Sequence, residues 1–329
     1  MDWLASIIVA VFGDFTLRLM PLYVGATLLI AVVIYGWRYG WRQWRSFFRW
    51  LTPKDIYLHP SHIVDLKLFV VGRLLSVAGV INLVVVRTAS AAFAMALLAA
   101  SFGTEPGTGS WSWGQIALAT LLFAVVSDFC TYWVHRIHHE YPVLWPFHSV
   151  HHSAEVLTPV TVYRKHPVYD LLSDAVSSLA IGFLAGALLF AISPNIDIIS
   201  IGGANVVFVV FNAVGANFRH SHIWISYGPV LEHVLISPAQ HQIHHSRAVV
   251  HHDRNYGEIF AIWDWMFGTL YVPAHEEKLE FGLAERDGTP IDQPHPSLAR
   301  ALIGPVEESW RQFRNRLAEP RPVADPPAE

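Results

Sequence analysis

Five apolar segments constrain the fold of this chain more than any other feature. They cover residues 16–36, 84–102, 113–134, 171–192 and 197–215. Each is close to the ~20 residues that a helix needs to cross the hydrocarbon core of a bilayer. With 53% hydrophobic and 15% charged residues, the chain is too apolar for a water-soluble domain of its length. We therefore expect an all-α, multi-span membrane bundle of about five spanning helices.

A sixth apolar stretch, residues 61–80, contains Asp65, Lys67 and Arg73. Charged side chains inside an apolar helix favour a position at the membrane surface over a full crossing. We therefore expect an interfacial or partly re-entrant helix in addition to the five spans.

Positive charge predicts the orientation of the bundle. Basic residues follow the first apolar segment at Arg38, Arg42, Arg45, Arg49 and Lys54. The turns at residues 103–110 and 193–195 contain no Lys or Arg, so the basic side is expected to be cytoplasmic. Five crossings then place the ends at residues 134 and 217 on that side too, with the C-terminus. No Lys or Arg precedes Arg18, so we expect no cleaved signal peptide.

Histidine is concentrated between residues 135 and 252, which hold fifteen of the 19 histidines. Most of them form three clusters: His135-Arg-Ile-His138-His139, His148-Ser-Val-His151-His152 and His241-Gln-Ile-His244-His245. Residues three and four apart share a helix face, so each cluster directs two or three imidazoles to one point. Neutral imidazole is a common ligand of transition metals. The pattern predicts a His-rich helical cap that binds metal on the cytoplasmic side.

The number of imidazoles favours two metal ions over one. A first-row metal takes about four to six ligands, whereas the clusters supply eight imidazoles before His138 is counted. Imidazole also binds zinc and copper, so the spacing leaves the identity of the metal open. The single cysteine, Cys130, excludes disulfides, thiolate zinc sites and iron–sulfur clusters. The HExxH motif is absent, because Val143 stands where its second histidine is required.

Other function classes are excluded by what the sequence lacks. The formal net charge of -4 and the absence of basic runs interleaved with aromatics argue against a nucleic-acid partner. Neither a Walker loop nor a GxGxxG fingerprint is present, so neither ATP nor a Rossmann-type cofactor is expected. Electrons, if the chemistry uses them, must come from another protein.

Two local patterns accompany the clusters. Asp128 shares a helix face with Thr131 and His135, and a carboxylate near the end of a span is costly unless it is paired or functional. Asp128 is therefore a candidate ligand or a residue that orients an imidazole, the alternative being a carboxylate that reaches the membrane surface. Ser237-Pro-Ala has the composition of a helix N-terminus, with Ser237 as the cap and proline at the first helical position.

The clusters resemble the histidine boxes HxxxH, HxxHH and HxxHH of the membrane-bound fatty acid hydroxylase and sterol desaturase superfamily. The segments around them are also similar, namely Asp128-Phe-Cys-Thr-Tyr-Trp-Val-His-Arg, Leu144-Trp-Pro-Phe-His, Ser237-Pro-Ala-Gln-His, Asn255-Tyr-Gly and Trp263-Asp-Trp-Met-Phe-Gly-Thr. With this resemblance we expect an N-terminal span and basic segment at 1–60, a catalytic domain at 61–272 and a C-terminal extension at 273–329. The Pro-rich tail of the extension is expected to be disordered.

The resemblance implies a non-haem pair of iron ions that activates O2 and hydroxylates or desaturates an unactivated C–H bond of a lipid, fatty acyl or sterol-like. It also implies an external electron donor, a ferredoxin or a cytochrome b5-like protein with its reductase. The sequence leaves the choice between hydroxylation and desaturation open, and it does not define the oligomeric state.

The resemblance further implies a set of metal ligands. They are His135, His139, His148, His151, His152, His241, His244 and His245 from the boxes, and His220 after the later spans. Some members have another ligand four residues beyond, where this chain has Trp224, so His222 or His166 is a candidate replacement or a supporting residue. The weaker candidates are His138, His251 and His252. The remaining histidines, His59, His62, His233, His275 and His295, are expected at the surface, and Asp264 is expected to brace the fold.

Two alternatives to the oxygenase stay open. A divalent-metal transporter or sensor would also use a His-rich site, with Asn205 and Asn212 as polar residues within the spans. The other alternative is a catalytically inactive scaffold that retains metal for stability alone.

Overall fold

The computed structural model describes residues 17–79, 84–103, 112–192 and 206–318, and this part of the chain is helical, without strands. The all-α fold class predicted from the sequence is confirmed. The α-helices are α2 (Pro21–Tyr39), α3 (Phe47–Leu51), α4 (Lys54–Tyr57), α5 (Pro60–Val77), α6 (Val84–Phe102), α7 (Trp113–Glu140), α8 (Trp145–His152), α9 (Pro167–Ile192), α10 (Val206–Val214), α11 (Gly228–Leu231), α12 (Pro238–His244), α13 (Ile262–Phe267) and α14 (Leu298–Ala318). Short 3-10 helices are η1 (Trp41–Ser46), η2 (Thr161–Tyr163), η4 (Ala216–Phe218) and η5 (Val249–His251).

Three of the described helices are long and apolar enough to cross a membrane, namely α2, α7 and the Pro167–Leu188 part of α9. A shorter apolar stretch, Val86–Phe102, lies in α6. These helices correspond to four of the five predicted spans. The fifth, predicted at 197–215, lies partly outside the described residues, and its described part holds only the short α10. The number of five spans therefore stays a prediction.

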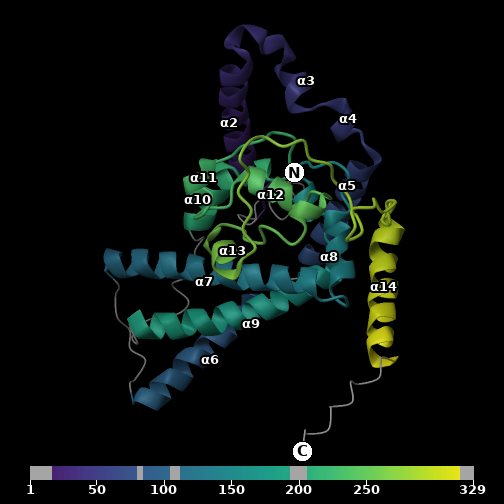
Figure 1. Ribbon diagram of the computed structural model, residues 1–329. Coiled ribbons are helices and arrows are strands. Elements are labelled where there is room, and N and C mark those ends of the chain that lie inside the picture. The colour runs from purple at the N-terminus through teal and green to yellow at the C-terminus, as the bar shows by residue number, and fades with distance from the viewer. Residues whose placement is uncertain (1–16, 80–83, 104–111, 193–205, 319–329) are drawn as a thin grey trace, which may run out of the picture.

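Helices α6, α7 and α9 form a layer in which α9 lies between α7 and α6 (Figure 1). Glycines allow α6 and α9 to approach closely. A Cβ atom on Gly182 would lie 2.4 Å from the Arg87 carbonyl oxygen, and one on Gly186 would lie 2.3 Å from that of Ala91. The Ser90 hydroxyl also donates to the Leu179 carbonyl at 2.8 Å. Small residues at the crossing therefore set the distance between these two apolar helices.

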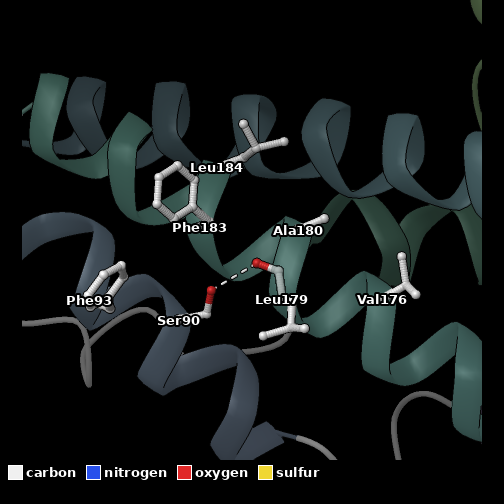
Figure 2. A pocket seen from close by; sticks show the side chains of 7 residues that line it. All are labelled: Ser90, Phe93, Val176, Leu179, Ala180, Phe183 and Leu184. Atoms are coloured by element: carbon white, nitrogen blue, oxygen red, sulfur yellow. Dashed lines mark hydrogen bonds between the residues drawn. The ribbon is translucent and has the colours of Figure 1, made fainter. Parts of the chain in front are cut away.

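An apolar groove of about 600 Å³ lies between the same two helices (Figure 2). It is lined by Ser90, Phe93, Val176, Leu179, Ala180, Phe183 and Leu184. None of its lining residues is a histidine, so the groove is separate from the imidazole clusters. It offers an apolar surface on the part of the molecule expected to lie within the bilayer.

Helix α5 occupies the predicted interfacial stretch, and it is not among the candidate spans of the described residues. Its Asp65 is fully buried and pairs with the fully buried Arg164 at 2.9 Å. Arg164 also donates to the carbonyl of Val150 in α8 at 2.7 Å and to the hydroxyl of Ser153 at 3.0 Å. This network therefore ties α5 to the helix that carries the second histidine cluster.

Two histidines expected at the surface are buried instead. His62 is 5% exposed and its Nδ1 lies 2.9 Å from the Thr158 hydroxyl. His295 is 6% exposed, and its carbonyl lies 3.4 Å from Arg164. The surface prediction for these two residues was wrong, because packing against the Asp65–Arg164 network covers them.

The C-terminal segment packs back onto the body of the protein. Gln293 donates to the Ser153 carbonyl at 2.6 Å, and Ser309 in α14 donates to the Val143 carbonyl at 2.7 Å. Helix α14 lies against α8 and α5 through an apolar cluster that includes Ala301 and Val150. Residues on both sides of the domain boundary predicted at residue 272 are therefore in contact. The boundary itself stays a prediction. The tail at 319–329 lies outside the described residues.

Candidate metal centre

Nine histidines converge in two groups, each able to hold a metal ion. The first group consists of His135, His139, His148, His152 and His244. One ring nitrogen of each of these residues lies within 4.8 Å of the ring nitrogens of the other four. The Nε2 atoms of His244 and His135 lie 3.1 Å apart, and those of His152 and His148 lie 3.2 Å apart. The same limit holds for the second group, which consists of His151, His220, His241 and His245.

The second group is fully buried and centred on His220. The His220 Nε2 atom lies 3.1 Å from the Nε2 atoms of both His241 and His245, and 3.3 Å from that of His151. The two groups adjoin, since the rings of His152 and His245 stack with centroids 4.6 Å apart. The nine residues are the ones named from the sequence as the principal ligands, and their role in binding metal stays a prediction.

Helix spacing explains how two short helices serve both groups. In α8, His148 and His152 are four residues apart and face the first group, while His151 faces the second. In α12 and its C-cap, His241 and His245 face the second group, while His244 faces the first. The predicted N-terminus of α12 is confirmed, with Pro238 at the first position and a capping box formed by Ser237 and Gln240.

The imidazole arrangement fits a metal better than it fits hydrogen bonding among the rings. His135 Nδ1 lies 2.8 Å from the Tyr256 carbonyl and His244 Nδ1 lies 2.7 Å from the Arg254 carbonyl, so each Nδ1–H donates outward. Their two Nε2 atoms must then present lone pairs to each other. Facing lone pairs in a buried site are unfavourable without a cation between them, and a carbonyl behind the imidazole is the usual support of a metal ligand.

Burial also keeps the imidazoles in the form that binds metal. Loss of hydration, followed by repulsion from neighbouring imidazoles, lowers the pKa of His244 and His245 to about 3. The same causes hold the pKa values of His148, His152 and His220 well below their usual range. These rings are neutral at pH 7 and available as ligands.

The five weaker candidates lie outside both groups, and each of them contacts another partner. The Nε2 atom of His166 lies 2.9 Å from the Leu302 carbonyl, and that of His222 lies 2.7 Å from the Trp50 carbonyl. His251 pairs with Glu277 at 3.1 Å, and His252 Nε2 lies 3.1 Å from the Arg247 carbonyl. His138 Nδ1 lies 2.7 Å from the Val134 carbonyl one turn back along α7. The structure therefore brings none of these five residues into a ligand group.

Asp128 braces a loop and contacts no imidazole. Its carboxylate accepts from the backbone N–H groups of Ile259 and Phe260 at 2.8 and 3.0 Å, and from Trp263 Nε1 at 3.0 Å. Asp128 belongs to neither ligand group, and its predicted role in orienting an imidazole stays a prediction. The loop that Asp128 holds also contains Tyr256, whose carbonyl accepts a hydrogen bond from His135. Asp128 therefore acts on the site indirectly, through this loop.

The loop between α12 and α13 was not predicted as a structural part of the site. Asn255 has a left-handed φ of 55°, and its side chain donates to the Gln240 carbonyl at 3.1 Å and accepts from the Tyr271 N–H at 2.7 Å. Asp264, predicted to brace the fold, accepts from the N–H groups of Tyr256 and Gly257, both at 2.8 Å. The Asn-Tyr-Gly sequence was the available signal, since asparagine tolerates left-handed backbone and glycine closely approaches its neighbours.

One aromatic side chain of the membrane layer borders the first group. The ring of Tyr169, near the start of α9, stacks on His148 with centroids 4.7 Å apart, and His138 packs edge-on against it at 4.6 Å. Nearby, Glu258 accepts a 2.5 Å ion-pair hydrogen bond from Arg18. The ring contacts link the first group to α9, and the ion pair links the loop between α12 and α13 to the segment before α2.

Comparison with known proteins agrees with this geometry. The family model for fatty acid hydroxylase matches residues 120–269, which contain all nine histidines. The chain is 31% identical to an alkylglycerol monooxygenase of Danio rerio over 184 residues, which are 56% of this chain and 35% of that protein. It is 29% identical to the ornithine lipid hydroxylase OlsE of Rhizobium tropici over 171 residues, 51% of this chain and 46% of that protein.

A third relative is a Delta(7)-sterol 5(6)-desaturase of Aspergillus fumigatus, 28% identical over 199 residues that make up 56% of this chain and 61% of that protein. The aligned region makes up less than half of the Danio rerio protein and less than half of the Rhizobium tropici protein. No solved structure matches the chain. Residues 120–269 are therefore a domain of the superfamily of membrane-bound fatty acid hydroxylases and sterol desaturases.

Proposed function

We propose that the chain is a membrane-bound, non-haem di-iron oxygenase that hydroxylates an unactivated C–H bond of a lipid. The observation that carries the proposal is the convergence of nine buried or half-buried imidazoles into two adjoining groups. Relatives named as a lipid hydroxylase, an alkylglycerol monooxygenase and a sterol desaturase support this class of reaction. Desaturation shares the removal of hydrogen with hydroxylation and is the other outcome within this class.

The two imidazole groups would each hold one iron ion. An all-nitrogen shell of neutral imidazoles suits iron in its reduced form and leaves positions for O2. When bound, the pair of irons would supply the reductive activation of O2. In a hydroxylation, one oxygen atom enters the C–H bond and the other leaves as water, so two electrons and two protons must be delivered for each product. Because the chain has no nucleotide fingerprint, we assign delivery of the electrons to an external ferredoxin or cytochrome b5-like partner.

The protein contributes orientation, exclusion of water and access for the lipid. The carbonyls of Tyr256 and Arg254 hold the rings of His135 and His244 with their Nε2 atoms inward. Helix α9 leads from Tyr169 at the first group to Val176 in the apolar groove, and residues seven apart share a helix face. A lipid chain held along this face would reach the imidazole groups without leaving an apolar environment.

The same proposal includes the location of the site. The charge asymmetry around the first span supports a cytoplasmic position for the imidazole groups and the C-terminus. Labelling of the variant His275→Cys, at an exposed position, tests this orientation in intact cells. Protection of that position from a membrane-impermeant reagent in intact cells is the expected result.

The described structure offers less to a metal transporter. Transport requires polar groups along a path through the spans, and the buried carboxylate of Asp128 is already used by Ile259, Phe260 and Trp263. Asn205 lies outside the described residues, and Asn212 lies in the short α10. Metal flux into vesicles that survives His148→Ala and His244→Ala but is lost with Asn205→Ala and Asn212→Ala would favour transport over oxidation.

The decisive experiment combines metal analysis with lipid mass spectrometry. The full chain, expressed in membranes and reconstituted anaerobically with iron, should contain about two iron ions, one for each group. Cells with the gene should contain an O2-dependent oxidised lipid that cells without it lack. His151→Ala should abolish this product, whereas His275→Ala, a change at an exposed position, should retain it.

Stoichiometric zinc, or no metal after reconstitution, together with no O2-dependent product, would refute the oxygenase. Normal lipid oxidation by the His151→Ala variant would refute the role of the second group. If the wild-type chain retains iron but the lipid composition of the cells is the same with and without the gene, the chain is an inactive scaffold.

A further inference from the structure

Helix α14 carries an apolar stripe that nothing in the described structure covers. Its members recur every three or four residues and are 42–71% exposed, namely Ile303, Val306, Trp310, Phe313 and Leu317. Side chains with this spacing form a continuous line along one face of a helix. A stripe of this length, with two aromatic rings, is unusual for a surface in contact with water.

The stripe cannot turn inward, because the neighbouring face of α14 is fixed. Ala301, Pro305 and Ser309 are buried on that face. Ser309 donates to the Val143 carbonyl at 2.7 Å, and the Leu302 carbonyl lies 2.9 Å from His166 Nε2. The exposure of the stripe therefore follows from how α14 packs on α8 and α5, and it does not reflect a loosely placed helix.

Positive charge borders the stripe on its other side. Arg314 follows Trp310 by four residues and precedes Leu317 by three, so it lies next to the stripe. Arg300 pairs with Glu307 at 3.4 Å, and Arg311 pairs with Glu308. With Arg316, the helix has four arginines and two glutamates, a formal surplus of two positive charges concentrated toward its C-terminal end.

We propose that α14 lies flat on the membrane surface, with its apolar stripe among the outer acyl carbons and its arginines on anionic lipid head groups. Tryptophan and phenylalanine on one face, arginine beside them and low overall hydrophobicity are typical of helices that lie in the plane of the interface. The membrane is also the apolar partner that a chain with three candidate spans always has beside it. In Figure 1, α14 runs across the direction of α7 and α9, two of the three candidate spans.

Spin labels on the full-length chain in lipid vesicles test this position. Val306→Cys and Phe313→Cys probe the stripe, and Asn315→Cys, an exposed position away from it, is the matched control. The native Cys130 is buried, and all three variants also carry Cys130→Ala so that only the introduced cysteine is labelled. Labels at 306 and 313 should collide with O2 several-fold more than with a water-soluble nickel chelate, and the label at 315 should show the reverse. A monodisperse peak in gel filtration and an unchanged melting temperature identify variants that fold.

The charge component is tested by lipid composition. In vesicles with phosphatidylglycerol, labels at 306 and 313 should lie deeper than in pure phosphatidylcholine, and the triple variant Arg311→Gln, Arg314→Gln, Arg316→Gln should lose this difference. Equal nickel accessibility at 313 and 315 would overturn the proposal. Depth that is independent of anionic lipid would overturn its charge component, and spin–spin broadening at 313 would show that a second copy of the chain covers the stripe instead.

Discussion

Two backbone carbonyls determine how the first group presents its nitrogen atoms. The carbonyls of Tyr256 and Arg254 accept from the Nδ1–H groups of His135 and His244, at 2.8 and 2.7 Å. Each bond fixes one tautomer and one ring orientation, so Nε2 is the atom left for a metal. The loop that supplies both carbonyls is therefore part of the site, although it has no ligand of its own within the two groups.

Substitution of Asp128 tests this indirect support at the residue scale. Asp128→Ala leaves three donors without an acceptor and should lower the free energy of unfolding by at least about 3 kcal/mol. Because the loop supports His135, the affinity of the first group for metal should fall about 10–100-fold. Asp128→Asn, which keeps an acceptor oxygen, should lose less of both.

Thermal unfolding and metal content of the purified variants measure the two effects separately. If Asp128→Ala unfolds like the wild type but binds no metal, then Asp128 is a ligand after all. If it is destabilised yet retains full metal affinity, then the loop does not support His135 in the way described.

At the scale of elements, the position of α8 depends on a buried ion pair outside the site. Arg164 and Asp65 are both fully buried, and Arg164 also holds the Val150 carbonyl of α8. Val150 lies between His148 and His151, which belong to different groups. A change in this pair should therefore disturb both groups at once, although no atom of the pair belongs to either.

Breaking the pair one partner at a time should be more harmful than removing both. Asp65→Asn or Arg164→Met alone leaves a buried polar group or charge without its partner, which costs about 3–5 kcal/mol for a buried pair. The double variant Asp65→Leu, Arg164→Met should recover part of that loss. Differential scanning fluorimetry of the single and double variants gives the coupling, with Arg300→Met, at an exposed pair, as the control. Additive losses in the double variant would contradict the pairing.

For the whole molecule, the parts that the sequence predicts are those governed by local spacing. Box spacing on a helix predicts eight of the nine imidazoles that converge, and His220 came only from the family resemblance. Apolar length predicts α2, α6, α7 and α9. The loop carbonyls and the burial of His62 and His295 depend on contacts between residues far apart in the chain. Asp128 was recognised as unusual, but its partners lie more than a hundred residues later, where helix periodicity carries no information.

The shared use of α8 and α12 has a consequence for how the protein acquires its metal. Each of these short helices contributes to both groups, so an ion that orders one group also orders the backbone of the other. If each group binds one ion, as proposed, we expect the two binding events to be linked by a favourable coupling free energy, typically about 1–3 kcal/mol. Anaerobic titration of the metal-free chain with cobalt should show few molecules with a single ion. His220→Ala, which alters only the second group, should lower the metal occupancy of the first group as well, and an unaffected first group would exclude the coupling.

With such coupling, a cell short of iron would hold a mixture of fully loaded and empty molecules, with few half-loaded ones.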